Sequence, residues 1–146
     1  MPSQGESDMA KAGTGPLRQP KILVVDDDLA LLRMLEKLMS PIGKVTCATD
    51  GQEALDFLTE GVMPDLIITD LMMPRMDGLQ LVDELRSNSK FKNIPVIMLT
   101  AKGTPKDVIT GINKGARHYL VKPFKNKDLV KKVATVLNRK DLIYSV

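Results

Sequence analysis

Short apolar runs alternate with longer amphipathic segments from residue 21 to the end of the chain. The runs are rich in Val, Ile and Leu, which favours strands buried on both faces of a sheet. The longer segments repeat apolar residues every three or four positions, which favours helices that pack on one face. The pattern predicts strands at 21–26, 44–48, 65–70, 95–100 and 118–122, and helices at about 29–40, 51–60, 78–88, 105–114 and 127–138.

Three of the predicted helices begin beside side chains that suit a helix start. Asp28 stands before the first helix, and its carboxylate favours an N-cap position. Thr104 is the expected cap of the fourth helix, with Pro105 in its first turn. Asn126 is the expected cap of the last helix. These side chains set the expected helix boundaries.

Five successive β-α units in about 120 residues predict an α/β fold with a five-stranded parallel sheet and helices on both faces. Among the strand orders common for such sheets, five strands favour 2-1-3-4-5, the flavodoxin-like doubly wound arrangement. In that order the first and third strands are neighbours at the switch point, where such sheets place their ligands. Residues at the carboxyl ends of these two strands are therefore expected to meet.

The same pattern divides the chain into a domain and two tails. Residues 1–20 are rich in Gly, Ser, Pro and Gln without apolar periodicity, and we expect a disordered N-terminal tail. Residues 21–140 form one predicted domain, which is long enough for a substantial core. Residues 141–146 are expected to form a short C-terminal tail.

Composition narrows the class of protein. Aromatic residues make up 3% of the 146 residues, so the core must consist of Leu, Ile, Val and Met. The single cysteine, Cys47, excludes an internal disulfide and a multi-cysteine metal site, and we expect a small buried hydrophobe. No run approaches the roughly 18 apolar residues of a membrane span. The N-terminus has no apolar signal core, so a cytoplasmic location is expected. The net charge of +3 is too small to indicate nucleic acid binding.

Polar side chains end four of the five predicted strands. Asp26 and Asp27 end the first strand and Asp70 ends the third, so the strand order brings three carboxylates together. Thr100 ends the fourth strand and Lys122 ends the fifth. Because parallel strands all point the same way, these five side chains are expected to face one crevice.

Three carboxylates at one place need compensating positive charge. Two like charges about 4 Å apart repel each other by about 4 kcal/mol at an effective dielectric constant near 20. Oxygen ligands without a nearby His or Cys select Mg²⁺, or Mn²⁺ in its place, over zinc. A carboxylate beside such a metal can attack phosphorus, while Lys122 and Thr100 hold phosphate oxygens. The pattern therefore indicates a site that accepts a phosphoryl group.

Four motifs in order connect this site to a known family. They are Val24-Val25-Asp26-Asp27-Asp28, Asp70 with Met73-Pro74 and Asp77-Gly78, Thr100-Ala101, and Lys122-Pro123-Phe124. Over about residues 21–138 they resemble the receiver domain of two-component response regulators. Each motif alone is weak, whereas all four in this order are highly specific.

The resemblance implies a role for each acidic side chain. Asp70 would be the residue that is phosphorylated. Asp27 and Asp70 would hold Mg²⁺, with Asp26 assisting directly or through water. The backbone carbonyl of Met72 would be a further ligand.

It also implies how a bound phosphoryl group is sensed. Lys122 would pair with the acyl phosphate, and Thr100 and Ala101 would line the phosphate. Thr100 would be the switch hydroxyl, and Tyr119, three residues before the lysine, the switch aromatic residue. The peptide bond between Lys122 and Pro123 is expected to be cis.

The implied function is a phosphorylation-dependent signalling switch rather than an enzyme. A histidine kinase or a phosphotransfer protein would supply the phosphoryl group. The downstream target would be a protein, bound by helix 105–114, strand 118–122 and helix 127–138, with no direct contact to nucleic acid or membrane. Basic residues on that surface form either a solvated face or a contact for an acidic partner: Lys106, Lys114, Arg117, Lys125, Lys127, Lys131 and Lys132.

Other classes of protein share parts of this pattern. The chain ends after the last helix, which favours a stand-alone receiver, although a fragment of a longer regulator is also compatible. The complete set of acids, threonine and lysine disfavours a docking module that is never phosphorylated. A phosphatase of the haloacid dehalogenase type needs a second Asp two residues after Asp70, where Met72 stands. A flavin-binding protein is disfavoured because three acids after the first strand would repel a phosphate.

Overall fold

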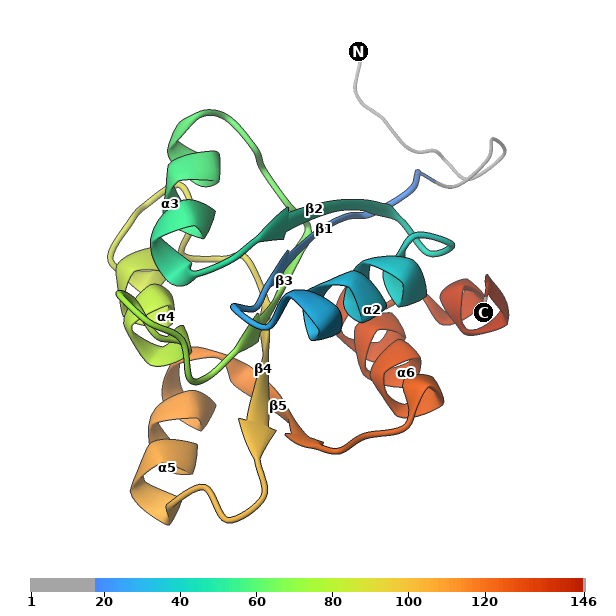
Figure 1. The fold of residues 1–146 in the computed structure, drawn as a ribbon. Coiled ribbons are helices and arrows are strands. Elements are labelled where there is room, and N and C mark those ends of the chain that lie inside the picture. Colours follow the sequence, from blue (N-terminus) through green and yellow to red (C-terminus); the bar gives the residue numbers. More distant parts are fainter. Residues whose placement is uncertain (1–17, 146) are drawn as a thin grey trace.

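The computed structural model describes residues 18–145, and Figure 1 shows a central sheet between two layers of helices. The sheet has five parallel strands in the order β2-β1-β3-β4-β5, so the predicted flavodoxin-like fold is confirmed. The strands are β1 Lys21–Val25, β2 Lys44–Ala48, β3 Leu66–Asp70, β4 Val96–Ala101 and β5 Arg117–Lys122. The helices are α2 Leu29–Met39, α3 Gly51–Thr59, α4 Gly78–Arg86, α5 Lys106–Gly115 and α6 Asn126–Leu137, followed by the 3-10 helix η1 Lys140–Ser145.

Each face of the sheet carries its own hydrophobic cluster. Helices α2 and α6 cover one face, and α3, α4 and α5 cover the other (Figure 1). Successive residues of β1 alternate between the clusters, with Ile22 and Val24 facing α2 and α6, and Leu23 and Val25 facing the opposite layer. Burial on both faces explains why the strands have continuous apolar sequences.

Strand β3 lies at the centre of the sheet and is buried along its whole length. Its parallel pairing with β1 places Val25 opposite Thr69, and one further step along the register brings Asp26 beside Asp70. Strands β2 and β5 form the sheet edges and are only partly buried. Cys47 of β2 is half-buried, and burial raises the pKa of its thiol to about 11.

Two of the three predicted caps are wrong. The Asp28 carboxylate does cap α2, where it accepts the N–H groups of the next turn. Helix α5 begins after Pro105, and the Thr104 hydroxyl instead donates to the carbonyl of Ala101 at 2.6 Å. Asn126 is the first residue inside α6 rather than its cap. Both errors arise because a backbone turn or a proline can start a helix without a capping side chain.

The two ends of the described chain are tied to the fold. The predicted disordered tail lies mostly outside the described residues, but its last part, from Arg18, is anchored because Arg18 pairs with Asp65 through bonds of 2.9 and 3.1 Å. Arg139 donates to the carbonyl of Arg18 at 2.9 Å and also pairs with Asp141. The segment expected as a C-terminal tail forms η1, in which Leu142 is 3% exposed. None of the helices between residues 18 and 145 is long and apolar enough to cross a lipid bilayer.

Candidate functional site

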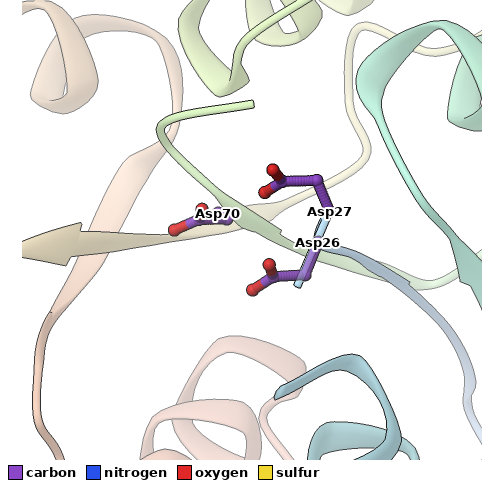
Figure 2. A group of neighbouring side chains, drawn as sticks. All are labelled: Asp26, Asp27 and Asp70. Carbon is purple, nitrogen blue, oxygen red and sulfur yellow. The ribbon is translucent and has the colours of Figure 1, made fainter. Parts of the chain in front are cut away.

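Three carboxylates meet where β1 and β3 end. Oxygen atoms of Asp26, Asp27 and Asp70 all lie within 4.8 Å of one another. Figure 2 shows the three side chains projecting to the same side of the strand ends. Asp26 and Asp70 are buried, whereas Asp27 is exposed, so the cluster opens to solvent on one side. The convergence that the strand order predicted is therefore present.

Burial makes this cluster unfavourable without a counter-charge. Burial raises the pKa of Asp26 to about 6, a hydrogen bond from the N–H of Asp28 lowers it, and the neighbouring charge of Asp70 raises it further. Oδ1 of Asp26 accepts that N–H at 2.9 Å, while Oδ2 is buried without a partner in the described part of the chain. An unpaired buried carboxylate oxygen is a free acceptor for a proton or a cation.

Lys122 brings positive charge to the site from the end of β5. Its Nζ donates to Oδ1 of Asp70 at 2.7 Å, and the two side chains are 30% and 10% exposed. One ammonium offsets one of the three carboxylates, so a net negative charge remains. The ligand atoms that this cluster offers are carboxylate oxygens, which suit a hard divalent cation such as Mg²⁺. Such a cation would also explain why Oδ2 of Asp26 is buried without a partner in the described structure.

Thr100 reaches the site from the end of β4. Strands β3 and β4 pair Asp70 with Leu99, so Thr100 is one residue further along the adjacent strand. The Thr100 side chain is fully buried, and its hydroxyl has no partner within the structure described. A buried hydroxyl without an acceptor costs about 1–3 kcal/mol, which a ligand oxygen would recover. Ala101, the next residue, is exposed at the end of β4.

The loop from residue 71 to 77 follows Asp70. Met72, two residues after Asp70, is 71% exposed. The loop is held at both ends, because the N–H of Leu71 donates to Leu99 and the N–H of Gly78 donates to the carbonyl of Leu71.

Tyr119 and His118 occupy opposite faces of β5. Tyr119 is half-buried and packs against the hydrophobic cluster that includes α5, opposite Met98 in the strand register. His118 is half-buried, and burial lowers its pKa, as do the charges of Lys132 and Arg117. The peptide bond between Lys122 and Pro123 is cis, as the sequence resemblance implied.

Sequence reasoning missed an ion pair that secures the loop after Asp70. Arg75 donates from Nε to Oδ2 of Asp50 at 2.8 Å, and its Nη2 contacts the same oxygen. Asp50 caps α3, and although its burial favours the protonated form, bonds from the Glu53 N–H and from Arg75 hold its pKa below the usual range. Arg75 has a φ of 65°, a left-handed conformation that is rare outside glycine.

A glycine allows the same loop to approach α3. The N–H of Gly51 donates to the carbonyl of Met76 at 3.3 Å, and a Cβ atom at Gly51 would lie 2.9 Å from that oxygen. The sequence predicted a helix at about 51–60, but it did not predict the contact of its first turn with the loop 25 residues later.

The fold and this arrangement of side chains define a class of signalling domain. A family model for the response regulator receiver domain matches residues 22–134. The chain therefore belongs to the response regulator receiver family, which serves two-component signalling.

Two named relatives differ in how much of their own length the chain covers. It is 44% identical over 120 residues to "Probable transcriptional regulator ycf27" of Guillardia theta, an alignment that covers 82% of this chain and 46% of that protein. It is 41% identical over 123 residues to chemotaxis protein CheY1 of Helicobacter pylori, covering 83% of this chain and 99% of CheY1. The chain thus spans about half the length of the ycf27 relatives and nearly all of CheY1.

Solved structures show the same fold. The receiver domain of the Francisella response regulator 1452 aligns with a TM-score of 0.71 at 37% identity, over 82% of this chain and 98% of that one. The receiver domain of the sensor histidine kinase PA1611 from Pseudomonas aeruginosa aligns with a TM-score of 0.73 at 28% identity, with the same coverage. That structure has a magnesium ion coordinated in its active-site cleft.

Proposed function

We propose that this chain is a phosphorylation-dependent switch in which Asp70 accepts a phosphoryl group from a histidine kinase or a phosphotransfer protein. The observation that carries the proposal is the contact of 2.7 Å between Lys122 Nζ and Asp70 Oδ1, beside two further carboxylates within 4.8 Å. A lysine and an acidic cluster around one carboxylate are the groups that phosphoryl transfer to an aspartate requires.

In the transfer step, a carboxylate oxygen of Asp70 attacks phosphorus in line with the bond to the donor. The new P–O bond forms as the P–N bond to the donor imidazole breaks, and the imidazole leaves with the electron pair of that bond. Lys122 offsets negative charge on Asp70 and afterwards on an oxygen of the acyl phosphate.

Mg²⁺, or Mn²⁺ in its place, is the cofactor that the acidic donors fit. The carboxylates of Asp26, Asp27 and Asp70 and the backbone carbonyl of Met72 would hold it. When bound, the metal offsets the charge that builds on the oxygens of the transferring phosphoryl group. The metal would also supply a partner, directly or through water, for Oδ2 of Asp26, which has none in the described structure.

Thr100 is the group that reports the phosphoryl group to the rest of the protein. Its unpaired hydroxyl donates to a phosphate oxygen once Asp70 is modified, which moves the side chain towards the end of β3. The space beside Thr100 then admits the ring of Tyr119, which lies one strand away on β5. The half-buried position of Tyr119 against the α5 side of the sheet supports this movement.

The output is contact with a downstream protein through α5, β5 and α6. Exposed basic residues on these elements, including Lys106, Lys127 and Lys131, favour an acidic partner. We place the switch in the cytoplasm, and its contact with the downstream target involves neither nucleic acid nor membrane. The same site serves equally in a stand-alone receiver or in the receiver of a longer regulator.

Labelling with radioactive acetyl phosphate and Mg²⁺ tests the proposal. The wild type should become labelled, Asp70→Asn should not, and chelation of the metal should prevent labelling of the wild type. Asp83→Asn is the matched control, because it removes one exposed carboxylate of α4. If the wild type stayed unlabelled, the chain would instead be a docking module that is never phosphorylated. Steady turnover of a phosphomonoester, lost in Asp70→Asn, would instead establish a phosphatase.

A further inference from the structure

We propose that a small cationic pocket at the amino ends of β4 and β5 binds the phosphate head group of a small molecule. The pocket lies between the loop that leads into β4, the end of α5 and the start of β5, and its volume is about 180 Å³. The acidic cluster lies at the carboxyl ends of the strands, at the other edge of the sheet. The pocket is therefore a separate site, and the proposal does not depend on phosphorylation of Asp70.

Positive charge without a matching acid distinguishes this pocket. Arg86, Lys92, Lys114 and Arg117 line it, and none of its lining residues is acidic. The ion pairs that the structure shows between residues 18 and 143 use none of these four side chains. None of these four charges is thus paired with an acid in the described part of the chain, and a bound anion would offset them.

Arg86 gives the pocket a fixed guanidinium. Its Nε donates to the carbonyl of Gly115 at 2.8 Å, and its Nη1 donates to the carbonyls of Lys92 and Ile94 at 2.9 and 3.0 Å. The bond to Gly115 also neutralises the negative end of α5, which would otherwise repel an anion. Nη2 of Arg86 has no hydrogen-bond partner in the part of the chain described, so its N–H groups remain available to a ligand.

Arg117, the first residue of β5, also lines the pocket and has a strained backbone conformation. Its φ of 72° is left-handed, which non-glycine residues rarely adopt. His118 follows it, and burial, with the charges of Lys132 and Arg117, lowers the pKa of the imidazole. The neutral ring offers the ligand a hydrogen bond rather than another charge.

Size and charge select the ligand. Pockets that enclose drug-sized molecules have volumes of about 300–1,000 Å³, so this smaller pocket accepts a head group while the rest of a ligand stays outside. The planar guanidinium of Arg117 can match two phosphate oxygens, whereas Arg86 offers only its Nη2. We therefore expect one or two phosphate groups, carried either by a soluble phosphate compound or by the head group of a phosphoinositide.

Calorimetric titration with sodium pyrophosphate tests the site, at low ionic strength and with a chelator present so that no metal bridges the acidic cluster. The wild type should bind pyrophosphate, with shifts of the backbone amide resonances concentrated in residues 114–118. In the double variant Lys114→Gln/Arg117→Asn, the Kd should rise by about tenfold, because each lost ion contact contributes up to about 1 kcal/mol. Asn is chosen because it tolerates a left-handed φ.

The matched control is Arg33→Gln/Lys37→Gln. It removes the same two charges from exposed positions of α2 that line neither the pocket nor the proposed output surface, so its Kd should change less than about twofold. Equal weakening in both double variants would show attraction to net charge alone and would overturn the proposal. Lys92→Gln, on the loop before β4, should independently raise the Kd for pyrophosphate. Thermal unfolding of every variant checks that the fold is intact.

A vesicle experiment separates the two sources of the phosphate group. Binding to phosphatidylcholine vesicles that contain a phosphoinositide, displaced by pyrophosphate, would assign a lipid head group. Binding of pyrophosphate without binding to those vesicles would assign a soluble ligand. Failure of the wild type to bind in either experiment would overturn the proposal while leaving phosphorylation of Asp70 untouched.

Discussion

At the scale of single residues, Asp26 is a buried carboxylate whose energetic cost the proposed metal site would explain. It is 1% exposed, one of its oxygens has no partner in the described structure, and two other carboxylates lie within 4.8 Å. Such a group destabilises the protein when no cation is present and stabilises the bound state when one is.

Replacing Asp26 by Asn should therefore stabilise the protein in the presence of a chelator. The free energy of unfolding, measured in urea, should rise by about 1–3 kcal/mol because one buried charge disappears while the acceptor for the Asp28 N–H remains. The additional stability that Mg²⁺ gives the wild type should shrink in the variant. Asp83→Asn, which is exposed on α4, should change neither quantity. A loss of stability in Asp26→Asn with chelator would contradict this account.

Thr100 makes a second prediction at the same scale. Thr100→Val keeps the shape of the side chain and removes a buried hydroxyl that has no partner among the residues described, so the unphosphorylated protein should gain about 1 kcal/mol. The same variant should lose the response of Tyr119 to beryllofluoride, seen as resonance shifts along β5. Thr100→Ser retains the hydroxyl and should retain the response. Shifts of equal size in Val and Ser variants would exclude Thr100 as the reporting group.

At the scale of elements, the loop after β3 is positioned by its contact with the start of α3. Arg75 crosses to the buried carboxylate of Asp50, and Gly51 allows the carbonyl of Met76 to approach. The loop carries the Met72 carbonyl, so this contact sets the position of a proposed metal ligand.

Arg75→Gln should lower stability near neutral pH by about 1 kcal/mol, a small value because Arg75 is 63% exposed. The folded state holds the pKa of Asp50 below its unfolded value, so its contribution is present above the unfolded pKa and is lost as the pH falls through the folded pKa. The difference between wild type and variant should therefore vanish in acid. Urea unfolding at several pH values measures it. Arg75→Lys keeps both the charge and the left-handed strain, so it should lose less stability than Arg75→Gln. A difference in stability between wild type and Arg75→Gln that persists at acid pH would rule out the ion pair as its cause.

The elements also show where sequence reasoning succeeds and fails. The apolar strands and their order follow from burial on both faces, and the convergence of Asp26, Asp27 and Asp70 follows from that order alone. The predictions of Thr104 and Asn126 as helix caps were wrong, because local backbone geometry decides where a helix begins and several sequences satisfy it. The pair of Arg75 and Asp50 could not be predicted, since it depends on the path of a loop rather than on periodicity.

At the scale of the whole molecule, the two ends of the described chain contact each other and are both bound to the domain. Arg18 binds Asp65 at the start of β3, and Arg139 links the Arg18 carbonyl to η1. Leu142 of η1 packs into the cluster under α2 and α6.

Leu142→Ala should lower the free energy of unfolding by about 2–3 kcal/mol, because it empties a buried position at the edge of a core. Ile143→Ala is the matched control on the next residue, which is 37% exposed, and should cost less than about 1 kcal/mol. Urea unfolding of both variants measures the contrast. Equal losses would mean that η1 contributes through its backbone rather than through Leu142.

The position of Tyr119 has an optical consequence. The chain has no tryptophan and two tyrosines, the other being Tyr144. With Tyr144→Phe as the background, the near-ultraviolet circular dichroism of the tyrosine band reports one ring, on the strand that links the acidic cluster to α5. A receiver of this composition is therefore its own spectroscopic probe, and the proposed phosphorylation of Asp70 would be visible in real time without an attached dye.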